Sequence, residues 1–147
     1  MKNLHLLLLS IGLLALAAPA QADGPDSATV KAVIHGLKNT SGKLLCAIYS
    51  NAQGWPDKGG VSRQAQSIAG KDATCVFSGL KPGTYAVTVL HDENNNGAMD
   101  YGTFGAPAEG WGSSNNITHT FSGPSFEESS FALSAGASMV VAIEIHN

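Results

Sequence analysis

An oxygen-rich stretch at residues 92–100 carries the most recognisable ligand chemistry of this 147-residue chain. Asp92, Asn94, Asn96 and Asp100 provide side-chain oxygens at even-numbered positions, and Gly97 lies among them. In EF-hand-type loops, alternate oxygens converge on a calcium ion and a glycine permits the sharp turn. The chain matches the first nine positions of such a loop, and the carbonyl of Ala98 would add a backbone ligand. The spacing therefore predicts a calcium-stabilised loop.

This calcium motif is incomplete at its end. Position 12, normally a bidentate glutamate, is Thr103, and a predicted strand leads into the loop where an EF-hand has a helix. The last ligand would therefore come from elsewhere, and Glu109 is the nearest acidic candidate. The alternative interpretation is a turn in which Asp and Asn side chains cap their own backbone.

The same stretch allows a second kind of chemistry, acid–base catalysis. His91, Asp92 and Glu109 could serve as acid–base groups of a hydrolase. No Gly-x-Ser-x-Gly elbow occurs, and the chain shows no nucleophile with its base. The histidines also lack the paired spacing of zinc or copper ligands, which favours structural roles. The sequence thus favours a non-enzymatic binding or accessory module. A hydrolase and a purely structural envelope module without ligand are the alternatives.

The loop belongs to an unusually long connection, residues 92–117, with little strand character. Connections in compact domains have a median of roughly 4–6 residues, and much longer ones are often functional. The aromatic residues Tyr101, Phe104 and Trp111 lie within this connection. We predict one long ordered loop with these aromatics as its recognition surface.

The elements that must position the loop are short segments of alternating polarity, a period typical of strands. They cover residues 29–35, 43–50, 61–68, 73–78, 84–91, 130–133 and 139–145. Residues 61–68 are polar enough for an edge strand or part of a loop, and no convincing helical periodicity occurs beyond residue 22. We predict an all-β fold: a single antiparallel β-sandwich of about seven strands.

Two cysteines, Cys46 and Cys75, lie on strand faces that point toward the predicted core. An even cysteine count in an exported protein favours a disulfide, which would stabilise the fold by about 3–4 kcal/mol. The alternative is two buried free thiols. A Cys-x-x-Cys redox pair is absent.

The N-terminal segment has the composition of a cleavable signal peptide. Lys2 precedes an apolar run, and the small-x-small pattern Ala20-Gln21-Ala22 follows it. Asp23, and not a cysteine for lipid attachment, stands directly after this pattern. The expected division is a signal peptide at 1–22 and a sandwich domain at 23–147, in the periplasm or secreted.

The charge balance limits the partners of the mature chain. Without Lys2, seven basic side chains stand against eleven acidic ones, a net charge of −4. A mildly acidic chain with no basic run is not expected to bind nucleic acid or anionic membranes. We expect an envelope or extracellular partner and no stable membrane insertion after signal cleavage.

Several motifs occur together around the loop. They are His91-Asp92-x-Asn94-x-Asn96-Gly97-x-x-Asp100, Phe104-Gly105-x-Pro107-x-Glu109-Gly110-Trp111-Gly112-x-Ser114-Asn115, Leu80-x-Pro82-Gly83-x-Tyr85-Ala86-Val87 and Gly123-Pro124-x-Phe126. Together they resemble the bacterial domain of unknown function 2141 (DUF2141). Two positions depart from its pattern: Gly102, where an Asn is common, and Ser113, where an aromatic is common.

The resemblance implies an exported β-sandwich and carries no established activity. The Leu80 to Tyr85 stretch is more distantly similar to transthyretin-like and carboxypeptidase-regulatory-like sandwiches, many of which are binding or accessory modules. The resemblance therefore implies a transthyretin-like or immunoglobulin-like sandwich. The Gly at position 102 removes one oxygen ligand that the family pattern would offer.

Overall fold

A computed structural model describes residues 24–147 of the chain. The predicted signal peptide, residues 1–22, lies outside the described residues, so it stays a prediction. Within the described part, no helix has the length and apolar character needed to cross a membrane.

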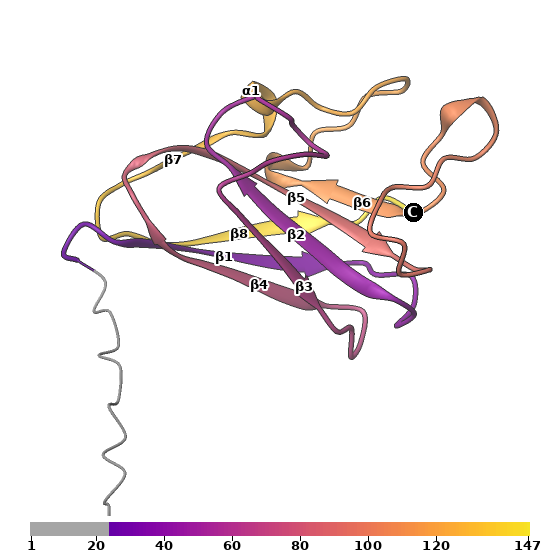
Figure 1. Cartoon of the computed structure of the whole chain (residues 1–147), viewed down its shortest axis with the longest axis horizontal. Coiled ribbons are helices and arrows are strands. Elements are labelled where there is room, and N and C mark those ends of the chain that lie inside the picture. Colours follow the sequence, from indigo (N-terminus) through magenta and orange to yellow (C-terminus); the bar gives the residue numbers. More distant parts are fainter. Residues whose placement is uncertain (1–23) are drawn as a thin grey trace, which may run out of the picture.

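Two β-sheets face each other and form a sandwich (Figure 1). The strands are β1 (Ala28–His35), β2 (Lys43–Tyr49), β3 (Ser62–Gln66), β4 (Ala73–Leu80), β5 (Gly83–Asp92), β6 (Gly110–Ser113), β7 (Phe131–Leu133) and β8 (Ser138–Glu144). One sheet has the order β4-β1-β8 and the other the order β3-β2-β5-β6, with β7 paired to the start of β5.

The alternation of polarity along the strands places one face of each sheet in a shared core. On β1, Val30, Ala32 and Ile34 are fully buried, while the residues between them are more exposed. Ile48 of β2 and Val87 of β5 meet this set from the second sheet. Burial of alternate apolar side chains therefore holds the two sheets together.

The all-β sandwich predicted from the sequence is confirmed, with three differences. The structure has eight strands among the described residues, and a short helix, α1 (Phe126–Ser129), follows β6. β8 pairs with β1 in parallel, which departs from a purely antiparallel arrangement. These two strands are the first and the last along the described chain, so no hairpin turn forces them to run antiparallel. The transthyretin-like or immunoglobulin-like detail stays a prediction.

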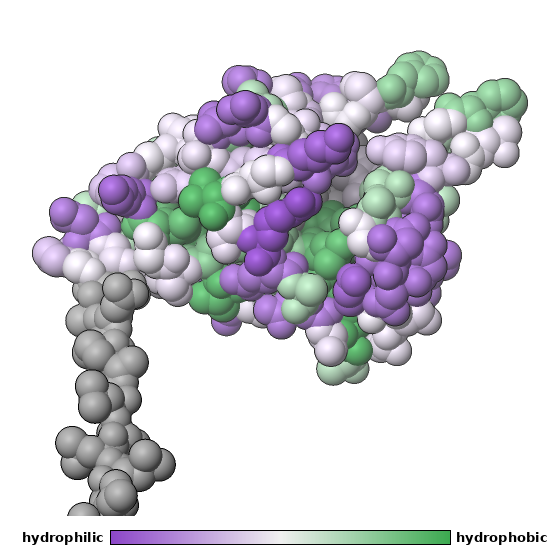
Figure 2. Space-filling model, in the orientation of Figure 1, coloured by the Kyte–Doolittle hydropathy of each residue, from purple (hydrophilic) through white to green (hydrophobic). Residues whose placement is uncertain are grey.

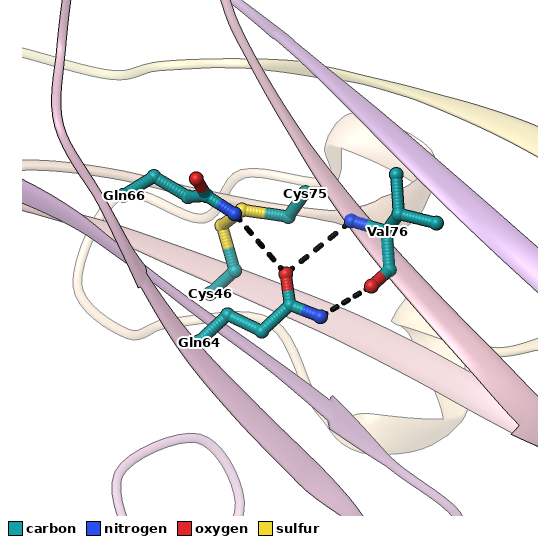
Figure 3. The surroundings of a disulfide bond; sticks show 5 residues. All are labelled: Cys46, Gln64, Gln66, Cys75 and Val76. Atoms are coloured by element: carbon teal, nitrogen blue, oxygen red, sulfur yellow. Dashed lines mark hydrogen bonds between the residues drawn. A yellow bond between two sulfur atoms is a disulfide. The ribbon is translucent and has the colours of Figure 1, made fainter. Parts of the chain in front are cut away.

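One open side of the sandwich, where edge strand β3 meets β4, is closed by side chains. The predicted disulfide is confirmed: Cys46 of β2 and Cys75 of β4 join the two sheets with an S–S distance of 1.98 Å. Beside it, the Gln64 side-chain amide donates to the Val76 carbonyl and accepts from the Val76 N–H at 3.3 Å (Figure 3). The amide thus pairs with β4 as a neighbouring strand would. We call this side the disulfide seam.

The opposite side, where β6 meets β8, is closed by backbone contact. Trp111 and His146 exchange two backbone hydrogen bonds of 3.0 and 2.8 Å. A Cβ atom on Gly112 would lie 2.7 Å from the carbonyl oxygen of Glu144, so only glycine permits this approach. The Asn116 side chain donates to the Ala142 carbonyl at 3.2 Å and accepts from the Glu144 N–H at 2.9 Å. We call this side the glycine seam.

A small second core lies on the outer face of the β2–β5 sheet. The Trp55 ring makes edge-to-face contacts with Tyr49 and Phe126, at centroid distances of 5.2 and 5.9 Å. The Trp55 indole N–H also donates to the Pro124 carbonyl at 2.9 Å. These contacts tie α1 and the segment before it to the sheet.

Candidate functional site

The oxygen-rich loop begins where β5 ends, on Asp92. The prediction that residues 92–117 have little strand character is wrong at β6, which pairs with β5. This strand reads Gly-Trp-Gly-Ser and therefore lacks the β-branched residues that mark strands in a sequence. Two 3₁₀ turns, Thr103–Gly105 and Ser114–Asn116, give the rest of the connection further order.

Asp92 organises the first turn of the loop. Its side chain is fully buried, and its two carboxylate oxygens accept from the backbone N–H groups of Asn96 and Gly97 at 3.0 and 2.9 Å. The ammonium group of Lys43, on the neighbouring strand, lies 3.6 Å from the same carboxylate. A buried charge is thereby hydrogen-bonded and paired, which makes its burial tolerable.

The other predicted ligands form a connected network around this turn. The amide of Asn94 donates to Asp100 at 2.5 Å, and the amide of Asn96 donates to both Asp100 oxygens at 3.0 Å. The side-chain oxygen of Asn94 accepts from the Asn96 N–H, and that of Asn96 accepts from the Ala98 N–H. The structure thus brings the four predicted side chains together in capped Asx turns.

Glu109 closes the loop from its far end. Its carboxylate is nearly buried and accepts from the N–H of Glu93 at 2.9 Å and from the N–H of Asp100 at 3.2 Å. One side chain therefore fixes the chain on both sides of the turn. The sequence pointed to Glu109 as a ligand, and nothing in its spacing indicated this bracing contact.

The loop offers carboxylate and amide oxygens, which are the ligand types that hard cations prefer. Asp92 and Asn94 each place one oxygen 3.0 Å from the same N–H, that of Asn96, so these two oxygens lie close together. Asp100 presents a carboxylate that is held by neutral amides. Among residues 24–147, no group of three or more His, Cys, Asp and Glu side chains is arranged to hold a metal. A calcium ion here would therefore draw on amide and backbone oxygens beside the two carboxylates.

The three predicted hydrolase groups are all buried, and each is engaged by the backbone. His91 is fully buried, and its Nε2 lies 3.0 Å from the Ser41 carbonyl. Asp92 and Glu109 both direct their carboxylates at backbone N–H groups. Two surface hollows, of about 420 and 570 Å³, are lined within residues 49–61 and 119–128. Neither hollow includes any of these three side chains.

The three predicted recognition aromatics occupy two places. Tyr101 and Phe104 lie on one projecting hairpin, where Tyr101 forms a bridge with Pro107. Trp111 is half-buried on β6, with its ring centroid 5.2 Å from that of His146. Phe121 is as exposed as Phe104, and the sequence analysis did not single it out.

A family model described as "Uncharacterized protein conserved in bacteria (DUF2141)" matches residues 32–141, which is most of the chain. The chain belongs to the DUF2141 family. The resemblance predicted from the motifs around the loop is thereby confirmed. Comparisons with curated proteins and with solved structures find no match. Membership of DUF2141 assigns no activity, so the function has to be argued from the site.

Proposed function

We propose that this DUF2141 protein is an exported, non-enzymatic binding or accessory module whose loop at residues 92–100 is ordered by calcium. Export is supported by the N-terminal signal pattern and by the Cys46–Cys75 disulfide, because disulfides persist mainly in oxidising compartments. The periplasm or the extracellular space is then its place of action, where free calcium is available to weak sites.

The observation that carries the calcium proposal is the gathering of four oxygen-bearing side chains around one turn. Asp92, Asn94, Asn96 and Asp100 would hold the ion, together with the Ala98 carbonyl. Two of these side chains, Asn94 and Asn96, now donate their N–H₂ groups to Asp100. Rotation of each amide would turn its oxygen toward the ion. Glu109 braces the loop and is the residue from which the last oxygen would come.

Calcium should act by stabilising the folded loop. A ligand that prefers the folded state stabilises it by RT ln(1 + [L]/Kd), which is about 2.7 kcal/mol at 100 times Kd. The absent position-12 glutamate favours weak affinity, with Kd roughly 10⁻⁴–10⁻³ M as in extracellular modules. The expected role of the ion is therefore to fix the recognition hairpin that follows the loop.

Calorimetry with calcium chloride, beside melting curves with calcium and with chelator, tests this proposal. The Asp100→Asn variant should lose both the binding heat and the rise in melting temperature. Glu93→Gln is the matched control, since its carboxylate accepts from Asn39 at 2.7 Å on the outside of the network. If 10 mM calcium gives no heat and no shift in the native chain, the loop is an Asx-capped turn. The structural envelope module is then the better interpretation.

A hydrolase built on His91, Asp92 and Glu109 has less support. The imidazole is enclosed in the core, and both carboxylates are engaged with backbone N–H groups. A general acid or base must reach the proton that it transfers, directly or through one water. The binding module needs no such access.

A further inference from the structure

Two phenylalanines, Phe104 and Phe121, project from the tips of two loops. Their exposed fractions are 102% and 99%, so neither ring is covered by the described chain. Figure 1 shows both loops leaving the same end of the molecule, and Figure 2 shows apolar residues at both tips. Together they form a two-pronged apolar surface, which we call the phenylalanine tips.

The Phe104 tip is a built turn. The Gly102 N–H donates to the Ala106 carbonyl at 2.7 Å, which closes the hairpin below the tip. Phe104 itself has φ of 62°, a left-handed conformation that is rare for bulky residues. Glycine or asparagine would adopt this conformation at lower energy, and a polar side chain would be better solvated. The ring is fully exposed, so burial of the side chain within residues 24–147 offsets neither disadvantage, which points to a role outside the chain.

The Phe121 tip is anchored at both of its ends. On one side, His119 Nε2 lies 2.9 Å from a carboxylate oxygen of Glu128. On the other, the Pro124 carbonyl accepts from the Trp55 indole N–H. The loop between these anchors therefore holds its phenylalanine away from the domain.

The chain segments that carry the two tips contain few charged side chains. Between Asp100 and Glu127, the only side chains that can be charged near neutral pH are Glu109 and His119. Glu109 is nearly buried, and His119 lies against Glu128 below the second tip. Moving the tips into an apolar medium would therefore desolvate few ionic groups.

We propose that the phenylalanine tips dock reversibly onto a membrane surface with neutral headgroups, where both rings enter the interfacial layer. The proposal takes from the proposed function only the location outside the cytoplasm. A lipid interface accepts two convex protrusions at any spacing, whereas a protein partner would need two pockets at a matching distance. Aromatic rings partition favourably into this layer. The net charge of −4 after signal cleavage and the absence of Lys and Arg between residues 100 and 127 disfavour anionic headgroups.

Sedimentation of the exported protein with phosphatidylcholine vesicles tests the docking. Phe104→Ser and Phe121→Ser should each lower the partition coefficient about tenfold, and the double variant about a hundredfold, because each ring loses its transfer into the apolar layer. Val140→Ser, which removes an exposed apolar side chain on β8, is the matched control and should bind as the native chain does. Unchanged melting temperatures would show that the variants are folded.

A second readout reports insertion directly. In a Phe104→Trp variant, brominated phosphatidylcholine should quench fluorescence more strongly than in the native chain, in which the rings of Trp55 and Trp111 pack against Tyr49 and His146. Absence of sedimentation at several millimolar lipid would overturn the proposal. So would equal binding by the double variant, or binding that requires anionic lipid. Capture of a protein through the two phenylalanines without lipid binding would assign the tips to a protein partner and overturn it as well.

The vesicle experiment is run with calcium and with chelator so that the two proposals fail separately. A measurable heat of calcium binding without lipid binding would refute the docking proposal alone. Lipid binding without a heat of calcium binding would refute the calcium proposal alone.

Discussion

Along the disulfide seam the two sheets are joined by side chains. Along the glycine seam their backbones come into direct contact, because Gly110 and Gly112 have no side chain to keep them apart. Cys46 and Cys75 span the first side, with the Gln64 amide beside them. On the second side, Gly110 and Gly112 let β6 approach β8 so closely that a Cβ atom would meet Ile145 or Glu144 below 3.0 Å. The same architectural problem, an open side of a sandwich, thus has two physical solutions.

The difference matters for where the molecule can open. A disulfide between residues separated by 29 positions restricts the unfolded chain, so it acts on the whole domain. Backbone approach stabilises only the folded state and has no covalent support. The connection that carries the oxygen-rich loop and Phe104 leads into β6 at the glycine seam, and the segment that carries Phe121 follows Asn116 of the same seam. Local opening should therefore begin on the side of the candidate site.

Breaking the disulfide seam should have the largest effect. In the Cys46→Ala/Cys75→Ala double variant, the free energy of unfolding should fall by about 3.5 kcal/mol, because the unfolded chain regains loop entropy. Urea denaturation of the variant and of the reduced native protein measures this loss. An equal loss of unfolding free energy in the two samples would show that the covalent bond, and not the changed side chains, is responsible. A loss below about 1 kcal/mol would contradict the dominant role of this seam.

Breaking the glycine seam should cost somewhat less. In Gly112→Ala, the added methyl group would lie 2.7 Å from Glu144 O and from a methyl of Ile143, so β6 and β8 must separate. We expect a loss of about 2–3 kcal/mol by denaturation, as for other overpacked sites. Gly123→Ala is the control, because its Cβ would meet nothing within 4 Å among the described residues. Equal stability of these two variants would argue against close approach as the device that closes this side.

The amide side chains allow a like-for-like comparison of the seams. Gln64→Ala and Asn116→Gly each remove one side chain that makes two hydrogen bonds to an edge strand. Glycine is chosen at position 116 because Asn116 has φ of 54°. Each variant should lose about 1–2 kcal/mol. Hydrogen exchange should rise at the Val76 N–H in the first variant and at the Glu144 N–H in the second. Exchange that rises equally at both seams in either variant would show that the seams are coupled.

The smallest expected effect is a pH dependence at α1, where the Glu128 carbonyl accepts from the side chain of Asn115, next to Asn116 of the glycine seam. The hydrogen bond from the Ser125 backbone, followed by that of His119, holds the pKa of Glu128 below its ordinary 4.5. Because the folded state favours the ionised carboxylate, this contribution is present above pH 4.5 and is lost as the pH falls through the folded pKa. Carboxyl NMR titration should place Glu128 below 4.5. Glu128→Gln should flatten the loss of stability in acid, and Glu127→Gln should leave it unchanged. A Glu128 pKa at or above 4.5 would refute the contact.

The sequence by itself determined the sandwich, the disulfide and the gathering of the loop oxygens. Each depends on features that the sequence shows directly: alternation along β1 and β5, a single pair of cysteines, and oxygen-bearing side chains at positions 92, 94, 96 and 100. The helix α1 was not predicted, because four residues show no helical periodicity; its signal in the sequence is the capping-box spacing of Ser125 and Glu128.

Only the tertiary structure decided how the sides of the sandwich close and what holds the loop in place. The β6 strand forms because its glycines fit against β8, and the bracing role of Glu109 depends on the folded path of the loop. The exposure of Phe104 and Phe121 likewise depends on the folded path of their loops, which brings no other segment of the described chain over the two rings. Each of these features is a relation between segments that are distant along the chain. Local residue patterns do not encode such relations, because the distance between two segments is set by the packing of everything between them.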